Sequence, residues 1–103
     1  MIRCAIYTRS ATVASYPCEA QRDACAAVAD ARGWTVLAER FDDPLSSGIR
    51  SERPGLSRLR QRARDAQVAV VLVWRMDRLS RSLRRFRSLS AELRSHGVPV
   101  LSV

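Results

Sequence analysis

Arginine side chains follow the most apolar segment of this sequence, and their type and spacing suit the binding of a phosphate group. Residues 74–82 are Trp-Arg-Met-Asp-Arg-Leu-Ser-Arg-Ser, directly after the apolar run 68–73. Arg stays protonated at physiological pH, and its planar fork binds phosphate through two hydrogen bonds. With Arg9 and Arg53, the arginines at 78 and 81 form a set that could hold a phosphodiester and stabilise a phosphoryl group in transfer.

Other chemistries lack the residues that they need. His96 is the single histidine and precedes Gly97 at an expected helix end, which argues against a Ser-His-Asp triad. The sequence has no glycine-rich phosphate loop, and Cys4, Cys18 and Cys25 lack the spacing of metal ligands. We therefore expect neither a cofactor nor a metal. An odd cysteine count without a secretory segment indicates the cytoplasm, and no apolar run reaches membrane-spanning length.

Positive charge is concentrated in the second half of this 103-residue chain. All eighteen basic residues are Arg, and the formal net charge is +8. Residues 1–55 carry seven Arg against seven acidic residues, whereas residues 56–103 carry eleven Arg against three. This asymmetry predicts a polyanion on one side of the molecule. Well-solvated helix faces in an arginine-rich protein are the alternative explanation.

Alternating strands and helices must position these arginines. Apolar runs at 2–7, 35–41, 68–73 and 98–103 predict strands, and segments 17–32, 54–66 and 78–97 have helical periodicity. Residues 43–48 have the composition of a loop. The order predicts an α/β domain of three layers: a mostly parallel sheet of four or five strands with helices on both faces. Ligands of such sheets bind at the carboxyl ends of the strands, where residues 7–10, 43–53 and 75–81 would meet.

Five polar motifs are distributed along the chain. They are Tyr7-Thr8-Arg9, Gln21-Arg22, Asp43 with Ser47-Gly48, Arg53-Pro54-Gly55-Leu56, and Asp-Arg-Leu-Ser-Arg-Ser at 77–82. In order and spacing they resemble the catalytic domain of the serine site-specific recombinases, the resolvase/invertase family, and most of all its large-recombinase branch. The resemblance covers nearly all of residues 1–103 and implies one resolvase-like catalytic domain. Family members continue into a dimerisation helix and a DNA-binding region, so we expect this chain to be a piece of a longer protein.

The resemblance also implies a reaction and a set of site residues. In that family a serine hydroxyl attacks a DNA phosphodiester, forming a 5′-phosphoserine without metal or nucleotide, and subunits of a tetramer then exchange and rejoin the ends. The residues implied to hold the scissile phosphate are Arg9, Arg53, Arg78 and Arg81. Asp77 would orient the neighbouring arginines, and the supporting residues would be Gln21, Asp43 and Ser47. The implied partners are DNA and further copies of the protein in a dimer or tetramer, with no membrane.

One position departs from the family pattern. The family motif Tyr-x-Arg-Val-Ser, placed on residues 7–11, puts Ala11 where the attacking serine belongs. A methyl group cannot attack phosphorus. Ser10 is one residue early, and adjacent side chains of an extended chain point to opposite faces, although a shifted loop could present Ser10 or Thr12. Pro17 also replaces the serine that often begins the family's Ser-x-x-x-Gln motif.

Three functions are therefore consistent with the sequence. The first is DNA recombination by cleavage and rejoining, either impaired by Ala11 or carried out by Ser10. The second is a non-catalytic DNA-binding or dimerisation module derived from a recombinase. The third is an unrelated flavodoxin-like domain that binds phosphate or RNA. Simpler roles exist for single residues: Asp77 as a helix N-cap, Gln21 as a solvated position and Asp43 as a turn former.

Overall fold

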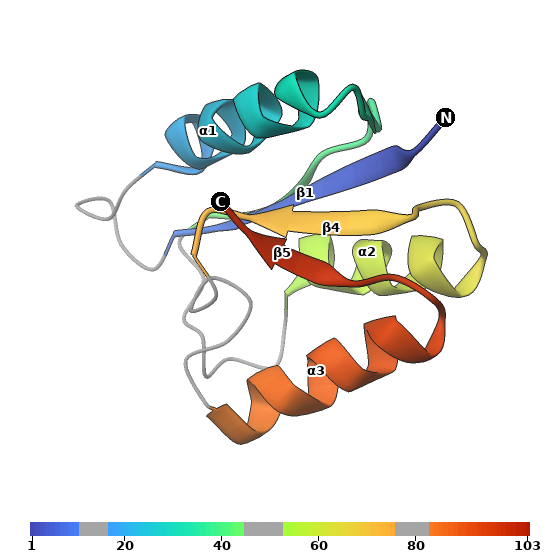
Figure 1. The fold of residues 1–103 in the computed structure, drawn as a ribbon. Helices are drawn as coiled ribbons and strands as arrows, with labels where there is room; N and C mark the ends of the chain where they lie inside the picture. Colours follow the sequence, from blue (N-terminus) through green and yellow to red (C-terminus); the bar gives the residue numbers. More distant parts are fainter. Residues whose placement is uncertain (11–16, 45–52, 76–82) are drawn as a thin grey trace.

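Parallel strands form the middle layer of the structure. The computed structural model describes residues 1–10, 17–44, 53–75 and 83–103. Within these residues the elements are β1 (Arg3–Arg9), α1 (Cys18–Ala31), β2 (Thr35–Val36), β3 (Phe41–Asp43), α2 (Pro54–Arg64), β4 (Val70–Val73), α3 (Leu83–Ser95) and β5 (Val100–Ser102). β1 pairs with β2, β3 and β4, and β4 pairs with β5, each time in parallel. α1 covers one face of the sheet and α2 and α3 cover the other, which confirms the predicted three-layer α/β fold (Figure 1).

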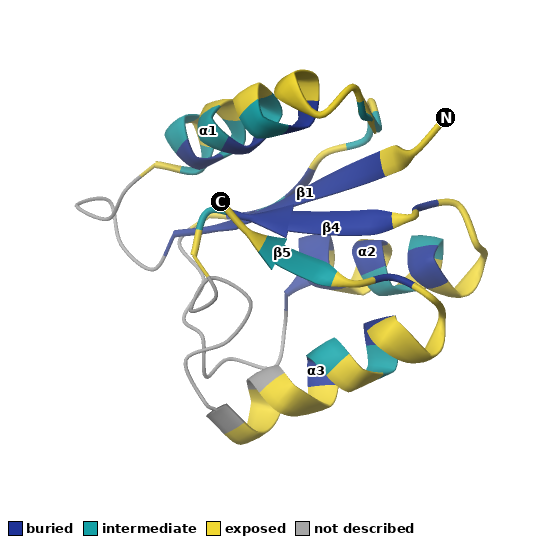
Figure 2. Ribbon diagram, in the orientation of Figure 1, coloured by how far each residue is buried: buried dark blue, intermediate teal, exposed yellow. Residues whose placement is uncertain are grey.

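The two central strands, β1 and β4, are buried on both faces (Figure 2). Cys4 and Ile6 belong to the core under α1, whereas Ala5 and Tyr7 belong to the larger core under α2 and α3. Alternate residues of one strand thus supply two cores, as expected for a strand with helices on both sides. This double burial explains why the sequence of β4 is an unbroken apolar run.

Two cysteines act as small apolar side chains in the core under α1. Cys4 and Cys25 are fully buried. Burial raises the pKa of the Cys4 thiol to about 11 and that of Cys25 to about 12, although the positive charge of Arg22 opposes both shifts. Both thiols therefore stay protonated at neutral pH and are poor nucleophiles.

The prediction of one strand over residues 35–41 is wrong, because two short strands, β2 and β3, form there. β2 pairs with the start of β1, where Arg3 is opposite Thr35, and β3 pairs with its end, where Arg9 is opposite Asp43. Residues 38–40 between them leave the ladder, and the polar side chains of this connection bind helices instead. Asp43 consequently ends a strand, although the sequence predicted that it begins a loop.

Two helix boundaries also differ from the prediction. α2 ends at Arg64 rather than near Ala66, and Ala66 has a φ of 57°, a left-handed conformation that stops a helix. The described part of α3 begins at Leu83, and the start expected near Arg78 lies outside the described residues. Because α3 runs antiparallel to β4, its first turn lies toward the carboxyl ends of the strands (Figure 1).

Candidate active site at the carboxyl edge of the sheet

A buried hydrogen-bond network joins the ends of β1 and β3 to the start of α2. The Tyr7 hydroxyl donates to Oδ2 of Asp43 at 2.7 Å. Nε and Nη2 of Arg53 donate to the same Tyr7 oxygen at 3.0 and 2.7 Å. Tyr7 is fully buried, and Asp43 and Arg53 are each 3% exposed. The network therefore holds a guanidinium, a phenol and a carboxyl group together at the edge where ligands of parallel sheets bind.

Tyr7 keeps its proton in this network. Burial raises the pKa of its hydroxyl far above the usual value, and Asp43 adds to this effect, whereas the guanidinium of Arg53 opposes it. A protonated phenol can donate to Asp43 and accept from Arg53 at the same time. Tyr7 thus fixes the distance between Asp43 and Arg53, a role that was not predicted from the sequence.

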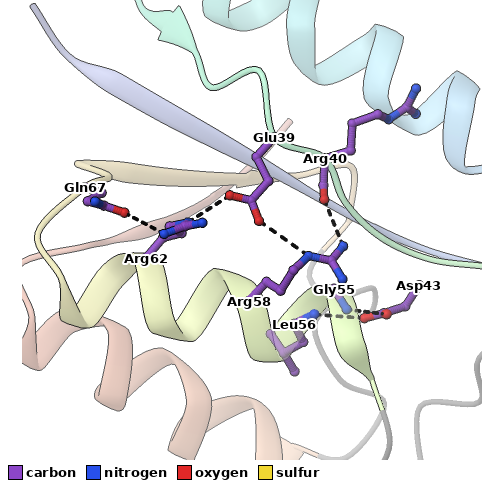
Figure 3. Close-up of polar contacts among 8 residues, drawn as sticks. All are labelled: Glu39, Arg40, Asp43, Gly55, Leu56, Arg58, Arg62 and Gln67. Atoms are coloured by element: carbon purple, nitrogen blue, oxygen red, sulfur yellow. Dashed lines mark hydrogen bonds and ion pairs between the residues drawn. The ribbon is translucent and has the colours of Figure 1, made fainter.

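Asp43 also provides the N-terminal cap of α2. Its Oδ1 accepts from the Gly55 amide at 2.7 Å, and its Oδ2 accepts from the Leu56 amide at 3.0 Å (Figure 3). The residue at the N-cap position, Arg53, makes no side-chain capping bond, so a carboxylate from β3 meets the positive end of the helix dipole. A side chain at Gly55 would bring its Cβ to 2.9 Å from the backbone of Asp42, so only glycine permits this close approach.

The side chain of Gln21, in α1, binds the backbone of Arg9, the last residue of β1. Its Nε2 donates to the Arg9 carbonyl at 2.9 Å, and its Oε1 accepts from the Arg9 amide at 3.3 Å. Gln21 is fully buried, so the solvated role considered from sequence is wrong. The next residue, Ser10, is 7% exposed and donates its amide to the Asp43 carbonyl at 3.3 Å. Gln21 and β3 thus determine where the chain leaves the sheet.

A second polar cluster lies beside this network and was missed from the sequence. The Thr8 hydroxyl donates to Oδ1 of Asp42, and Arg40 donates to Oδ2 of Asp42 at 2.8 Å. Arg40 also pairs with Glu19 of α1. The alternation of side chains along β1 and β3 places Tyr7 with Asp43, and Thr8 with Asp42, on opposite faces of the sheet. The consecutive Asp-Asp pair at the end of a strand was the available signal.

The structure brings together half of the predicted site. Arg9, Ser10, Gln21, Asp43 and Arg53 lie at the ends of β1 and β3 and at the starts of α1 and α2. The other predicted residues lie outside the described residues: Ala11, Ser47, Asp77, Arg78 and Arg81. Their placement in the site, and the N-cap role considered for Asp77, stay predictions.

Within residues 1–10, 17–44, 53–75 and 83–103, no group of three or more His, Cys, Asp or Glu side chains could hold a metal ion. None of the helices placed in the structure is long and apolar enough to cross a membrane.

The parallel sheet, with arginine and carboxylate side chains buried at its strand ends, defines a resolvase-like α/β domain. A family profile described as "Resolvase, N terminal domain" matches residues 4–103. The chain therefore belongs to the resolvase family of serine recombinases.

Individual relatives agree with this assignment. The serine recombinase Gin of Escherichia phage Mu is 45% identical over 58 residues, which are 56% of this chain and 28% of Gin. The DNA-invertase BinR of transposon Tn552 from Staphylococcus aureus is 41% identical over 58 residues, or 56% of this chain and 29% of BinR. The matched segment thus spans less than a third of each of these relatives.

Solved structures match over almost the whole chain. The N-terminal catalytic domain of TP901-1 integrase is 33% identical with a TM-score of 0.87, and the match covers 97% of this chain and 75% of that one. The C-terminal catalytic domain of ISC1926 TnpA, an IS607-like serine recombinase, is 29% identical with a TM-score of 0.88, covering 98% and 69%.

Proposed function

We propose that this chain is the catalytic domain of a DNA site-specific recombinase of the serine type, in which phosphoryl transfer is impaired because Ala11 occupies the nucleophile position. In the intact protein, DNA and further copies of the chain would be its partners. The observation that carries the proposal is the buried network of Tyr7, Asp43 and Arg53 beside Arg9.

The positions of Arg9 and Arg53 support a role in binding a phosphodiester. Arg9 is 1% exposed and Arg53 is 3% exposed, and both lie at the carboxyl edge of the sheet. Burying a charged guanidinium is expensive, so its presence at a strand end favours a functional reason. Guanidinium groups fixed before substrate binds stabilise a phosphoryl transition state without the cost of reorganisation.

Ser10 is a poor substitute for the missing nucleophile. Its amide is tied to the carbonyl of Asp43, and the residue is almost fully buried. Gln21 fixes the preceding residue, Arg9, by two hydrogen bonds. Alternation along β1 assigns Tyr7 and Arg9 to the α2 face, so continued extended backbone would direct Ser10 toward the α1 face. We therefore do not propose Ser10 as the residue that attacks the DNA phosphodiester.

The absent nucleophile also favours a second candidate, a non-catalytic DNA-binding or dimerisation module derived from a recombinase. The two candidates share the fold and the phosphate-binding edge. They differ in whether a serine restored at position 11 can react.

A covalent trapping experiment tests the proposal. The chain is joined to the remaining part of a serine recombinase and incubated with a nicked DNA site that prevents rejoining, and protein attached to DNA is measured on a denaturing gel. We expect no adduct from the unsubstituted protein and an adduct from Ala11→Ser. Ser10→Ala in the Ala11→Ser background is the matched control and should leave the adduct unchanged.

The alternatives give different results. An adduct from the unsubstituted protein that Ser10→Ala removes would make Ser10 the nucleophile. Ala11→Ser without an adduct, in a protein that still binds DNA, would favour the non-catalytic module.

A further inference from the structure

The outward face of α3 carries arginines that the candidate active site does not use. Arg84, Arg87 and Arg94 are exposed on this helix. Figure 2 shows that most of the outward side of α3 is exposed. Leu89 and Leu93 face the core, and a helical rotation of 100° per residue places the three arginines on the opposite side. This surface, which we call the α3 arginine face, points away from the sheet.

No ion pair or side-chain hydrogen bond holds these three arginines within the part of the chain that the structure describes. The one acidic residue of α3, Glu92, accepts two hydrogen bonds from Arg60 of α2, at 2.7 and 2.6 Å. That carboxylate is therefore already neutralised by another helix. The α3 arginine face keeps its full positive charge.

The surface between the arginines is open and lined by small side chains. Arg87, Ser90, Ala91, Arg94 and Ser95 line a shallow depression of about 440 Å³. Small residues between the guanidinium groups allow a polyanion to approach the helix closely, and serine hydroxyls can donate further hydrogen bonds to phosphate oxygens.

We propose that the α3 arginine face binds the sugar-phosphate backbone of duplex DNA without sequence choice, as a contact separate from the cleavage site. Arg84 and Arg94 are ten residues apart, or about 15 Å along a helix, a length over which duplex DNA presents about nine phosphate charges. Several phosphates are thus within reach without an exact register. The inference rests on the proposed function only in naming DNA as the polyanion.

The position of this face favours DNA over an acidic protein surface. The first turn of α3 lies toward the side to which the carboxyl ends of the strands point, so the α3 arginine face begins on the same side of the molecule as the candidate active site (Figure 1). A duplex bound at that edge would have flanking phosphates near Arg84. An acidic protein is the competing occupant, and a second copy of the chain offers the exposed Asp23 and Asp30 on the outer side of α1.

The salt dependence of DNA binding tests the proposal. Binding of the 103-residue chain to a short fluorescent duplex of arbitrary sequence is measured by anisotropy at several salt concentrations. In the double variant Arg87→Ala/Arg94→Ala we expect the slope of log K against log salt to become shallower by about 1.8, because each phosphate contact contributes about 0.9. Arg87→Lys/Arg94→Lys should keep most of the slope, since it keeps the charge.

A charge-matched control comes from α2. Arg58→Ala/Arg62→Ala removes the same charge from the same side of the molecule, but both arginines pair with Glu39, so the slope should change by much less. Thermal unfolding of the α3 variants should match the parent, because the substituted side chains are exposed. The α2 variant should lose only about 0.5 kcal/mol, because its ion pairs are partly exposed.

Three results would overturn the inference. An unchanged slope in Arg87→Ala/Arg94→Ala, with normal binding by the parent chain, would reject the α3 arginine face alone and leave the proposed function in place. Absence of salt-dependent DNA binding by the parent would also reject the α3 arginine face as a DNA contact, whereas the proposed function of the intact protein is tested separately by covalent trapping. Loss of self-association in the variant, without loss of DNA binding, would assign the face to a second copy of the chain.

Discussion

α2 and α3 lie on the same face of the sheet and carry four arginines each, but they use them differently. In α2, Arg58 and Arg62 pair with Glu39 at 3.4 and 2.8 Å (Figure 3). Arg60 of α2 pairs with Glu92 of α3. The fourth arginine of α2, Arg64, donates to Gln61. The exposed arginines of the α3 arginine face have no such partner in the described ranges.

The difference depends on where acidic side chains lie and not on the number of arginines. Glu39 comes from the connection between β2 and β3, which crosses beside α2, and Glu92 points from α3 toward α2. Ion pairs therefore hold α2 both to the β2–β3 connection and to α3. The carboxylate of α3, Glu92, pairs with α2, whereas Arg84, Arg87 and Arg94 of α3 stay exposed to an external anion.

The largest expected effect on stability is at Asp43, the residue that caps the start of α2. Asp43→Ala removes the acceptor for the Tyr7 hydroxyl and for the Gly55 and Leu56 amides, all of which are buried. Because lost partners leave buried donors unsatisfied, we expect the free energy of unfolding to fall by about 3 kcal/mol or more. Urea denaturation followed by circular dichroism measures this loss.

Asp23→Ala is the matched control for this substitution. Asp23 is an exposed aspartate on α1, so its loss should change the free energy of unfolding by less than about 0.5 kcal/mol. Equal effects of the two substitutions would show that α2 does not depend on the carboxylate of β3.

The order of elements was predictable because each left a local pattern. The apolar run of β4, the helical spacing around Leu56 and Leu59, and the glycines at 33 and 97 all indicated the correct element type. The resemblance also selected Arg9, Gln21, Asp43 and Arg53, which the structure places near one another.

The strand boundaries and the roles of several polar residues depend on tertiary contacts, which the sequence does not show. Whether residues 35–41 form one strand or two depends on which part of β1 each half meets. Tyr7 acquires its role through Arg53, which is 46 residues away in the sequence, and Asp43 caps a helix that begins eleven residues later. Likewise, no local pattern shows that Glu39 neutralises two arginines of α2 while α3 keeps its own charge.

Releasing the arginines of α2 should make this helix resemble α3. Glu39→Gln removes the carboxylate that pairs with Arg58 and Arg62 while keeping the size of the side chain. We expect stronger nonspecific DNA binding, with a slope of log K against log salt that is steeper by up to about 1.8, because two arginines become available for phosphate. Anisotropy titrations measure the change.

The cost in stability should be small, about 0.5 kcal/mol, since these pairs are partly exposed. Asp65→Asn, which removes one negative charge from an exposed position beyond α2, is the control for net charge alone. The same gain in both variants would mean that overall charge, and not the release of two particular arginines, determines DNA binding.

The smallest effect on stability is expected at the ion pair between Arg60 of α2 and Glu92 of α3. The two hydrogen bonds from Arg60 hold the pKa of Glu92 below its ordinary value, against a smaller opposing effect of burial. A carboxyl group with a lowered folded-state pKa stabilises the fold above its unfolded pKa of about 4.3, and this contribution is lost as the pH falls through the folded value. Glu92→Gln should therefore reduce the free energy of unfolding by about 0.5 kcal/mol near neutral pH.

Urea denaturation from neutral to acid pH shows whether that loss comes from the ion pair. The deficit of Glu92→Gln should shrink as Glu92 of the parent chain becomes protonated, because both chains then present a neutral side chain to Arg60. A deficit that stays constant with pH would assign the effect to packing between α2 and α3. In that case Glu92 would not be the group that holds α3 to α2, and the difference between α2 and the α3 arginine face would depend on Glu39 alone.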